Sequence, residues 1–405
     1  MSKSVDVLII GGGPAGFFAA ISSKTHHPDQ SICILEGSNK VLSKVLISGG
    51  GRCNVTHACF DPKQLIGYYP RGGDFLLNPF KTFHCGHTVE WFESRGVSLK
   101  TEEDGRMFPV TNSSKTIADC LEREAKKASI AVKTGERVTS ISPSDGGWMV
   151  QTSTSTWKAC KVILASGSNQ LIWNQLERLG IEIIEPVPSL FTFRCAHPLF
   201  SELPGISVPT ARLTYESIST DGPLLITHRG LSGPAVLKLS AWAAREFNQV
   251  DYTFTCRINW LGKSRDAVES DLLAYADAHA KSYVRSQPLF DLPKRLWTSI
   301  LNFCDISENR NWAEFGKKQR TSLVEALTAT RVEVTGKDTF KEEFVTAGGI
   351  ALHQINPKTM ELIEHPGLFA AGEVLDVDAL TGGFNFQGSW TTGFLAGKTL
   401  GTKNE

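Results

Sequence analysis

The fold class is decided near the N-terminus by Val5-Asp6-Val7-Leu8-Ile9-Ile10-Gly11-Gly12-Gly13-Pro14-Ala15-Gly16, an apolar run of strand length that leads directly into a G-x-G-x-x-G turn. In such turns the first glycine allows the tight bend, the second lets the backbone approach a pyrophosphate, and the third lets the next helix pack against the strand. These roles fall to Gly11, Gly13 and Gly16. The helix expected over 14–23 would turn its unpaired N–H groups toward the phosphates. The stretch therefore predicts a dinucleotide site on a Rossmann-like α/β fold.

A second expected strand, 31–35, is followed by Glu36, twenty residues beyond Gly16. An acid at that position accepts a hydrogen bond from a ribose hydroxyl and repels a 2′-phosphate, so the site is expected to hold FAD or NAD rather than NADP. The alternative is a glycine-rich turn that arose by chance in another α/β protein.

Length and composition limit the classes of protein to which this chain can belong. A chain of 405 residues is long enough for two or three domains. Its 42 basic and 42 acidic residues balance, so neither nucleic acid nor an anionic membrane is an expected partner. Nine cysteines without a C-x-x-C pair argue against a disulfide framework and a metal site, and they favour the cytoplasm. No stretch is apolar for the length of a bilayer span.

A second glycine-rich stretch, 44–54, is expected to be a ligand-binding loop. Three successive glycines let backbone amides come close to a bound group, and Lys44 and Arg52 offer positive charge to phosphates. The alternative is a solvated flexible loop. Cys53 could be a redox partner of a flavin, but with no neighbouring cysteine it is expected to pack against the cofactor.

The next part of the chain mixes one helix with alternating apolar patterns. The expected elements are a turn at 105–109, a helix at 114–127 and strands near 137–141, 148–152 and 157–161. The turn either faces the ligand or only connects its neighbours. A buried strand then ends in Ala165, Ser166 and Gly167, small residues that allow close approach of a dinucleotide.

Beyond Pro186-Val187-Pro188 the sequence changes to short strand-like runs with many prolines, which indicates a second domain. Strand candidates at 190–195, 211–219, 224–227 and 252–258 predict an antiparallel sheet or small barrel. Helical spacing at 265–285 and 307–328 predicts an inserted helical subdomain. The first domain then resumes with a strand leading into 372–376, a glycine turn at 382–383 and a helix to Leu400.

Four blocks occur in the order typical of one family: 11–16 with Glu36, 44–54, 105–109, and 344–350 with 372–387. They resemble BaiN-type NAD(P)/FAD-dependent oxidoreductases, bacterial flavoproteins also called aminoacetone-oxidase-like; the block 227–234 is similar too. The resemblance implies a discontinuous Rossmann-like FAD domain, interrupted by a barrel-like antiparallel β domain with a helical insert. The implied boundaries are 1–187 and 344–405 for the FAD domain, 188–260 and 329–343 for the β domain, and 261–328 for the helical insert.

The resemblance also implies roles for single residues. Glu36 would bind the adenosine ribose, Val138 the adenine through its backbone and Glu373 the ribityl chain, while 383–387 would place a helix N-terminus beside the flavin. Motif and resemblance together give these FAD-binding residues: Gly11, Gly13, Pro14, Ala15, Gly16, Glu36, Lys44, Ser48, Gly51, Arg52, Cys53, Asn54, Val138, Ala165, Ser166, Gly167, Gly372, Glu373, Gly383, Phe384, Asn385 and Gln387.

The chain departs from the family pattern in two places. Family members commonly have a longer Gly/Ser-rich loop where 165–169 runs quickly into a helix ending at Gly180, which is expected to alter the mouth of the active site. His57 stands where many relatives have Asn.

The leading functional hypothesis is hydride transfer between FAD and a small organic substrate, with reduction of an activated double bond by NADH or NADPH as its specific form. Amine oxidation with oxygen as acceptor is an alternative, and so is a non-catalytic flavin-binding protein for assembly or sensing. His57 and His228 are the candidate acid–base residues, each with a purely structural role as the alternative. No second G-x-G-x-x-G unit follows residue 16, so a nicotinamide is expected to bind transiently, between the FAD domain and the inserted domain, in the cleft that substrate uses.

Overall fold

The computed structural model describes residues 2–338 and 345–400. These residues form two compact units, unit 1 with 2–187 and 345–400 and unit 2 with 188–338. Residues 339–343 of the expected β-domain return, and Phe344 at the start of the fourth block, lie outside the described residues.

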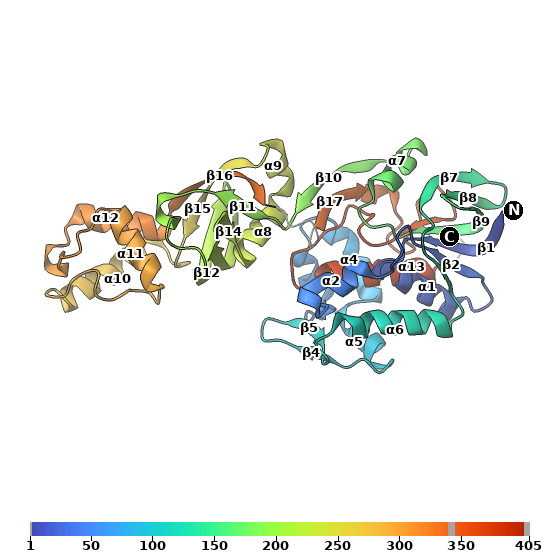
Figure 1. Cartoon of the computed structure of the whole chain (residues 1–405), viewed down its shortest axis with the longest axis horizontal. Coiled ribbons are helices and arrows are strands. Elements are labelled where there is room, and N and C mark those ends of the chain that lie inside the picture. Colours follow the sequence, from blue (N-terminus) through green and yellow to red (C-terminus); the bar gives the residue numbers. More distant parts are fainter. Residues whose placement is uncertain (1, 339–344, 401–405) are drawn as a thin grey trace. The chain divides into compact units, whose positions relative to one another are not determined.

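Unit 1 is built on a mixed sheet with the strand order β6-β2-β1-β9-β8-β7, and β18 pairs with β9 as well (Figure 1). The strands are β1 (Lys3–Ile10), β2 (Ile32–Leu35), β6 (Ala131–Lys133), β7 (Val138–Ser144), β8 (Gly147–Thr152), β9 (Thr156–Leu164) and β18 (Leu368–Ala370). The pairs β1–β2, β1–β9, β2–β6 and β9–β18 are parallel, whereas β7, β8 and β9 form an antiparallel meander. The sheet is therefore Rossmann-like at its centre and antiparallel at one edge.

The register of the parallel strands brings their carboxyl ends to one edge of the sheet. Ile10 lies opposite both Leu35 and Leu164, and Leu164 lies opposite Ala370. The chain segments that follow these strands, beginning at Gly11, Glu36, Ala165 and Ala371, consequently leave the sheet side by side. This is the edge at which open α/β sheets bind their ligands.

Two long helices, α1 (Pro14–His26) and α13 (Phe384–Lys398), pack directly against each other. Small residues allow this: a Cβ added at Gly393 would lie 2.6 Å from the Ala15 carbonyl oxygen, and one at Gly397 would lie 2.2 Å from that of Ala19. Helix α13, near the C-terminus, thus packs closely against α1, the first helix of the chain.

The remaining elements of unit 1 surround this core. The helices are α2 (Ser43–Gly51), α3 (Pro62–Leu65), α4 (Gly73–Thr82), α5 (Cys85–Glu93), α6 (Ser114–Lys127) and α7 (Gln170–Arg178). The strands β3 (Thr56–His57), β5 (Arg106–Pro109) and β4 (Leu99–Thr101) form a three-stranded sheet, and β10 (Ile183–Ser189) pairs with β17 (Val345–Ile350).

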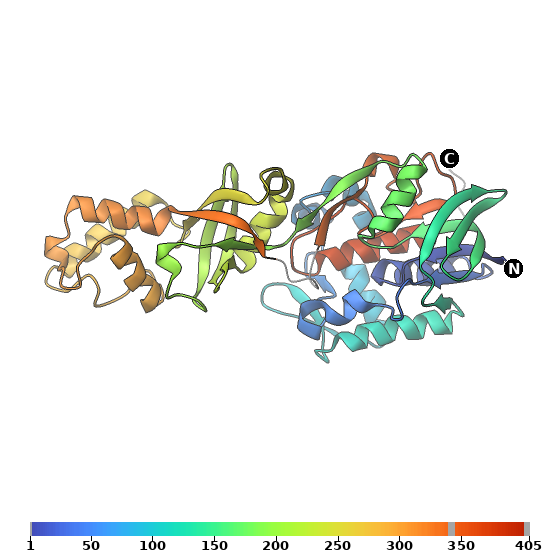
Figure 2. The same cartoon turned by 45° about the horizontal axis from the view of Figure 1, so that its top comes forward.

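Unit 2 is a closed six-stranded barrel with a helical region at one end (Figures 1 and 2). The barrel order is β11 (Thr192–Cys195), β14 (Gly230–Ser232), β13 (Ile218–Ile226), β12 (Ser207–Tyr215), β15 (Thr253–Asn259) and β16 (Thr330–Asp338). The helices are α8 (Pro234–Trp242), α9 (Ala244–Gln249), α10 (Arg265–Ala278), α11 (Lys294–Phe303) and α12 (Lys317–Thr328). One hydrophobic core runs from the barrel into α10, α11 and α12, so the helical insert and the barrel form a single unit.

The predicted fold class is confirmed: a Rossmann-like α/β domain with a barrel of antiparallel strands and a helical region. Several element predictions were wrong in detail. The expected turn at 105–109 is largely strand β5, because Met107, Phe108 and Pro109 are buried between β3 and β4. The strand expected at 211–219 is two strands joined by a tight hairpin, in which Glu216 adopts φ 48°.

The helical insert also differs from the prediction. Helix α10 ends at Ala278 rather than near 285, and α12 begins only at Lys317, after Gly316. Helix α11, which follows Pro293, was missed. Among the described residues, no helix is both long and apolar enough to cross a bilayer.

Candidate functional site

The glycine turn between β1 and α1 has two kinds of glycine. A Cβ added at Gly16 would lie 2.0 Å from the Gly11 carbonyl oxygen, and one at Gly11 would lie 2.2 Å from that of Ala165, so both positions are closed by the protein itself. Among the described residues, apart from Gly13 and its two chain neighbours, no heavy atom lies within 4 Å of a Cβ added at Gly13. Gly13 therefore borders open space at the N-terminus of α1, where a pyrophosphate would approach the helix N–H groups.

Glu36 is held in place by backbone donors. Its Oε2 accepts a hydrogen bond from the Gly12 N–H at 2.9 Å, and its Oε1 accepts one from the Ser38 N–H at 2.8 Å. Each carboxylate oxygen can accept a further bond. Glu36 thus fixes the glycine turn and keeps acceptor capacity for a ribose hydroxyl, and the ribose contact itself stays a prediction.

A cavity of about 400 Å³ opens beside Glu36. Gly11, Val138 and Ser166, three other residues expected at the cofactor, line it as well. The Ser166 Oγ is buried and has no hydrogen-bond partner among the described residues. The donors, acceptors and apolar side chains that line the cavity fit the adenosine end of a dinucleotide. The resemblance places that end at Glu36 and Val138.

The short loop after β9 contributes to the same cavity. Asn169 caps α7 by accepting hydrogen bonds from the N–H groups of Leu171, at 3.0 Å, and Ile172, at 3.4 Å, and all three residues line the cavity. The loop thus helps to shape the cavity beside Glu36, and its effect on the mouth of the active site stays a prediction.

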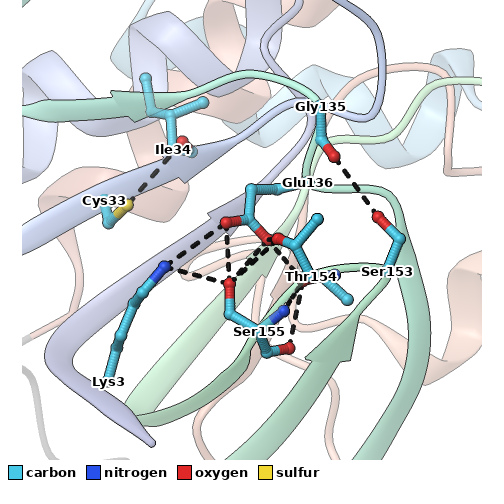
Figure 3. A network of polar contacts seen from close by, with 9 residues as sticks. Lys3, Cys33, Ile34, Gly135, Glu136, Ser153, Thr154 and Ser155 are labelled. Atoms are coloured by element: carbon cyan, nitrogen blue, oxygen red, sulfur yellow. Dashed lines mark hydrogen bonds and ion pairs between the residues drawn. The ribbon is translucent and has the colours of Figure 1, made fainter. Parts of the chain in front are cut away.

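Sequence reasoning missed Glu136, a buried carboxylate in the cavity wall. Figure 3 shows its polar contacts. Glu136 accepts hydrogen bonds from the hydroxyls of Thr152, Thr154 and Ser155, and Lys3 lies 3.5 Å away. Burial alone would raise the pKa of Glu136, but these hydroxyl hydrogen bonds and the lysine lower it to about 2. The run of five hydroxyl residues at 152–156 was the available signal.

We expect Glu136→Gln to lower the free energy of unfolding by about 1–3 kcal/mol at pH 7, because a buried carboxylate loses charge-assisted hydrogen bonds. The folded-state pKa lies below the ordinary value of 4.5, so this stabilisation is present above pH 4.5 and is lost as the pH falls toward 2. Urea unfolding of both proteins at pH 7 and pH 3 measures it. An equal difference at the two pH values would contradict the assignment.

The second glycine stretch is not a simple loop, which corrects the expectation for 44–54. Its first part is helical in α2, because Leu42 and Val45 are buried, and the helical conformation ends at Ser48. Gly49, Gly50 and Gly51 then adopt φ values of 56°, 65° and 82°. Cβ atoms added at Gly50 and Gly51 would have no neighbour within 4 Å in the described part of the chain beyond the adjoining residues, so open space borders this segment too.

The charged residues of this stretch are paired within the protein. Lys44 forms an ion pair with Glu373, and Gly167 lies beside both side chains. Arg52 contacts Glu102 at 2.7 Å and lies 4.1 Å from the centre of the Phe108 ring. Lys44, Gly167 and Glu373, expected separately from the sequence, are thus brought together.

Cys53 is buried, and burial raises the pKa of its thiol to about 12. A thiol with this pKa stays protonated at neutral pH and is a poor nucleophile. The packing role expected for Cys53 agrees with this environment better than a redox role.

The N-terminus of α13 is fixed by side chains that were expected at the flavin. Gly383 adopts φ 91° before the helix, and the Asn54 amide, oriented to satisfy both its groups, accepts from the Gly383 N–H at 3.0 Å. Asn385 accepts from the Ala379 N–H at 2.9 Å. Asn54 and Asn385 therefore hold the backbone that leads into the helix.

Gln387 lies deeper than the sequence suggested. It is fully buried, and its Oε1 accepts hydrogen bonds from the hydroxyls of Thr56, at 2.6 Å, and Thr88, at 2.9 Å. Its side chain thus ties α13 to β3 and α5, and a contact of Gln387 with FAD stays a prediction.

The two candidate histidines differ in environment. His57 stacks on Phe384 with ring centres 4.6 Å apart, and its Nε2 contacts the Asp104 carbonyl oxygen at 3.0 Å. Burial lowers the pKa of His57, so its ring is neutral at neutral pH. His228 is exposed and belongs to unit 2. The acid–base role of either residue stays a prediction.

We expect Glu36→Ala to weaken FAD binding by about 1–3 kcal/mol, the range for a hydrogen bond to a charged group. Titration of the apoprotein with FAD measures the affinity. Thermal unfolding of the same apoprotein is the control, because Glu36 also holds the N–H groups of Gly12 and Ser38. Unchanged FAD affinity would exclude a ribose contact.

Fold and site define an FAD-dependent oxidoreductase with a Rossmann-like domain. A model of the HI0933-like protein Rossmann domain matches residues 5–399, and the chain belongs to this family. The resemblance to BaiN-type flavoproteins is thereby confirmed, and the protein is an enzyme.

Two curated relatives align over almost the whole chain. A 3-dehydro-bile acid delta(4,6)-reductase of Clostridium scindens is 28% identical, with 96% of this chain and 97% of the relative covered. A ribosomal RNA dihydrouridine synthase of Escherichia coli is 26% identical, with 98% of each chain covered.

A solved structure shares the fold over the same length. A 3-ketosteroid-delta4-(5alpha)-dehydrogenase of Rhodococcus jostii superposes with a TM-score of 0.55 at 14% identity and covers 99% of this chain and 97% of its own. At this identity the similarity concerns the fold alone.

Proposed function

We propose that this enzyme reduces a carbon–carbon double bond conjugated to a carbonyl group, with NADH or NADPH as hydride donor. The observation that carries the proposal is the full-length similarity to two relatives whose names describe this chemistry. A bile acid delta(4,6)-reductase acts on ring double bonds in a 3-oxo compound, and dihydrouridine is uridine whose ring double bond, conjugated to a carbonyl, has been saturated. The relatives differ in substrate but share the reacting group.

We further propose that the substrate is a small molecule. Proteins that bind RNA neutralise phosphates with excess basic side chains. This chain has 42 basic and 42 acidic residues, which favours an uncharged or weakly charged substrate. An RNA substrate is then one of the outcomes that the experiment below separates.

The residues of unit 1 fit the cofactor that this chemistry needs. FAD, when bound, supplies the hydride for the double bond. Glu36 would hold the adenosine ribose, the open space at Gly13 would admit the pyrophosphate, and the N-terminus of α1 would face its charge. We propose that Lys44 and Glu373, as an ion pair, position the ribityl end.

The reduction also requires a proton on the second carbon of the double bond. A neutral His57 has a single N–H, which it donates to the Asp104 carbonyl oxygen in this arrangement. We therefore propose that His57 and Phe384 together form an aromatic wall and that His57 is not the proton donor. His57→Phe should then retain turnover, whereas a loss of reduction with unchanged FAD content would restore His57 as the acid.

Steady-state kinetics test the use of a nicotinamide. With a single dinucleotide motif in the chain, we expect donor and acceptor to use one cleft in turn. Initial rates measured with NADPH or NADH and a 3-oxo-4-ene steroid should give parallel double-reciprocal lines, with mutual competitive inhibition at high concentration. Intersecting lines and a stable ternary complex would contradict this order.

A further inference from the structure

The wall of the cavity beside Glu36 contains an arginine whose charged group has no partner among the described residues. Arg137 lines the cavity, and in the described residues its guanidinium has no hydrogen bond or ion pair. The stem of its side chain lies over Gly37, whose added Cβ would be 3.5 Å from the Arg137 Cα and 3.8 Å from its Cγ. These are ordinary van der Waals distances, so Arg137 lies directly beside Gly37, the residue after Glu36.

The backbone of Arg137 is fixed although its head group is not. Its carbonyl oxygen accepts a hydrogen bond from the Ser153 N–H at 2.8 Å, and the preceding Glu136 donates its N–H to the Glu36 carbonyl oxygen at 2.9 Å. The Glu136 carboxylate is anchored to the hydroxyls of the β8–β9 turn (Figure 3). Hydrogen bonds therefore hold the backbone of Arg137, while its guanidinium at the cavity wall has no partner among the described residues.

Leu171 is an exposed apolar residue in the same cavity wall. It lies in the first turn of α7 with 53% of its surface exposed, and it lines the same cavity. A single exposed leucine is unremarkable on a protein surface. In a cavity wall that also contains Arg137, however, Leu171 provides an apolar face for a flat ring.

We propose that Arg137 and Leu171 bind the adenine ring of FAD, Arg137 by stacking its planar guanidinium on the purine and Leu171 by apolar contact. The inference rests on FAD as the cofactor of the proposed function. Guanidinium groups stack favourably on aromatic faces, and bases accept such contacts without sequence-specific hydrogen bonds. The short loop after Gly167 has a consequence here, because it brings the first turn of α7 into the cavity wall.

The test is the affinity of the apoprotein for FAD, followed by flavin fluorescence. Arg137→Ala should weaken FAD binding roughly threefold to thirtyfold, the range expected for a partly desolvated cation–π contact. Arg137→Lys, which keeps the charge but not the plane, should lie between Arg137→Ala and the wild type. Arg178→Ala is the matched control, because Arg178 is also an exposed arginine of unit 1 but is not part of the cavity wall.

Competition with ADP separates an adenine contact from a general loss of structure. If Arg137 binds the adenine, the inhibition constant of ADP against FAD uptake should rise by the same factor as the FAD dissociation constant, while the apoprotein unfolds at an unchanged temperature. Leu171→Ser should weaken FAD and ADP together as well. Unchanged FAD affinity in both variants, or weaker FAD binding with unchanged ADP inhibition, would overturn the proposal.

These outcomes are distinct from a failure of the proposed function. Wild-type apoprotein that takes up no FAD would refute the cofactor and the reductase together. Tight FAD binding in the wild type and in both variants would refute only the roles of Arg137 and Leu171.

Discussion

Gly13→Val should give a folded protein that contains no flavin. The backbone of Gly13 has φ −90° and ψ −172°, which a valine adopts without strain, and apart from Gly13 and its two chain neighbours no atom of the described residues lies within 4 Å of the added Cβ. The valine side chain would instead fill the space at the N-terminus of α1 that a pyrophosphate needs. The absorbance spectrum of the purified variant measures the loss of flavin, and its circular dichroism measures whether the protein is folded.

Gly16→Val is the informative comparison. There the added Cβ would lie 2.0 Å from the Gly11 carbonyl oxygen, so the turn itself must distort. We expect this variant to lose flavin together with stability, whereas Gly13→Val loses flavin alone. A Gly13→Val protein that keeps its full complement of flavin would show that the dinucleotide binds elsewhere.

Asp378→Ala should strongly destabilise unit 1. Arg71 and Asp378 form a two-pronged ion pair in which the exposed fractions of the side chains are 9% and 0%. Removal of one member of a buried pair deprives the other charge of its ion-pair partner, which costs about 3–5 kcal/mol. Urea unfolding of the wild type and the variant gives the difference in unfolding free energy.

The control for this experiment is the exposed pair of Arg212 and Asp221, whose side chains are 45% and 57% exposed. Asp221→Ala should change the unfolding free energy by at most about 1 kcal/mol, because solvent screens exposed pairs. If Asp378→Ala were no more damaging than Asp221→Ala, the Arg71–Asp378 pair would not hold the segment before α13.

The central layout of unit 1 could be predicted from sequence because it depends on local rules. A strand, a glycine turn and a helix follow one another in 5–23, and the parallel register then brings Gly11, Glu36 and Ala165 to one edge. The barrel was foreseen from its alternating strands. Its hairpin at Glu216 was missed because a two-residue turn without glycine, proline or asparagine gives little signal.

The missed features depend on contacts between distant parts of the chain. Glu136 receives its hydrogen bonds from residues 16 to 19 positions later, across the meander, and Arg71 meets Asp378 across 307 positions. The conformation of 105–109 is likewise set by strands on both sides. Motifs predicted the segments that bind the cofactor, but they could not show which of their side chains make hydrogen bonds or ion pairs within the protein.

The central claim, a flavin-dependent reductase of conjugated double bonds, is tested most directly by a single anaerobic turnover. The enzyme-bound flavin is first reduced with NADPH or NADH, the excess nicotinamide is removed, and the reduced enzyme is mixed with a 3-oxo-4-ene steroid, with a uridine-containing RNA, or with buffer. We predict that the steroid restores the oxidised flavin spectrum without oxygen and that the product is two hydrogen atoms richer than the substrate. Reoxidation by the RNA alone would move the substrate class from small molecules to RNA. A flavin that stays reduced with both acceptors until oxygen enters, and that a primary amine can reduce, would contradict the reductase and identify an amine oxidase.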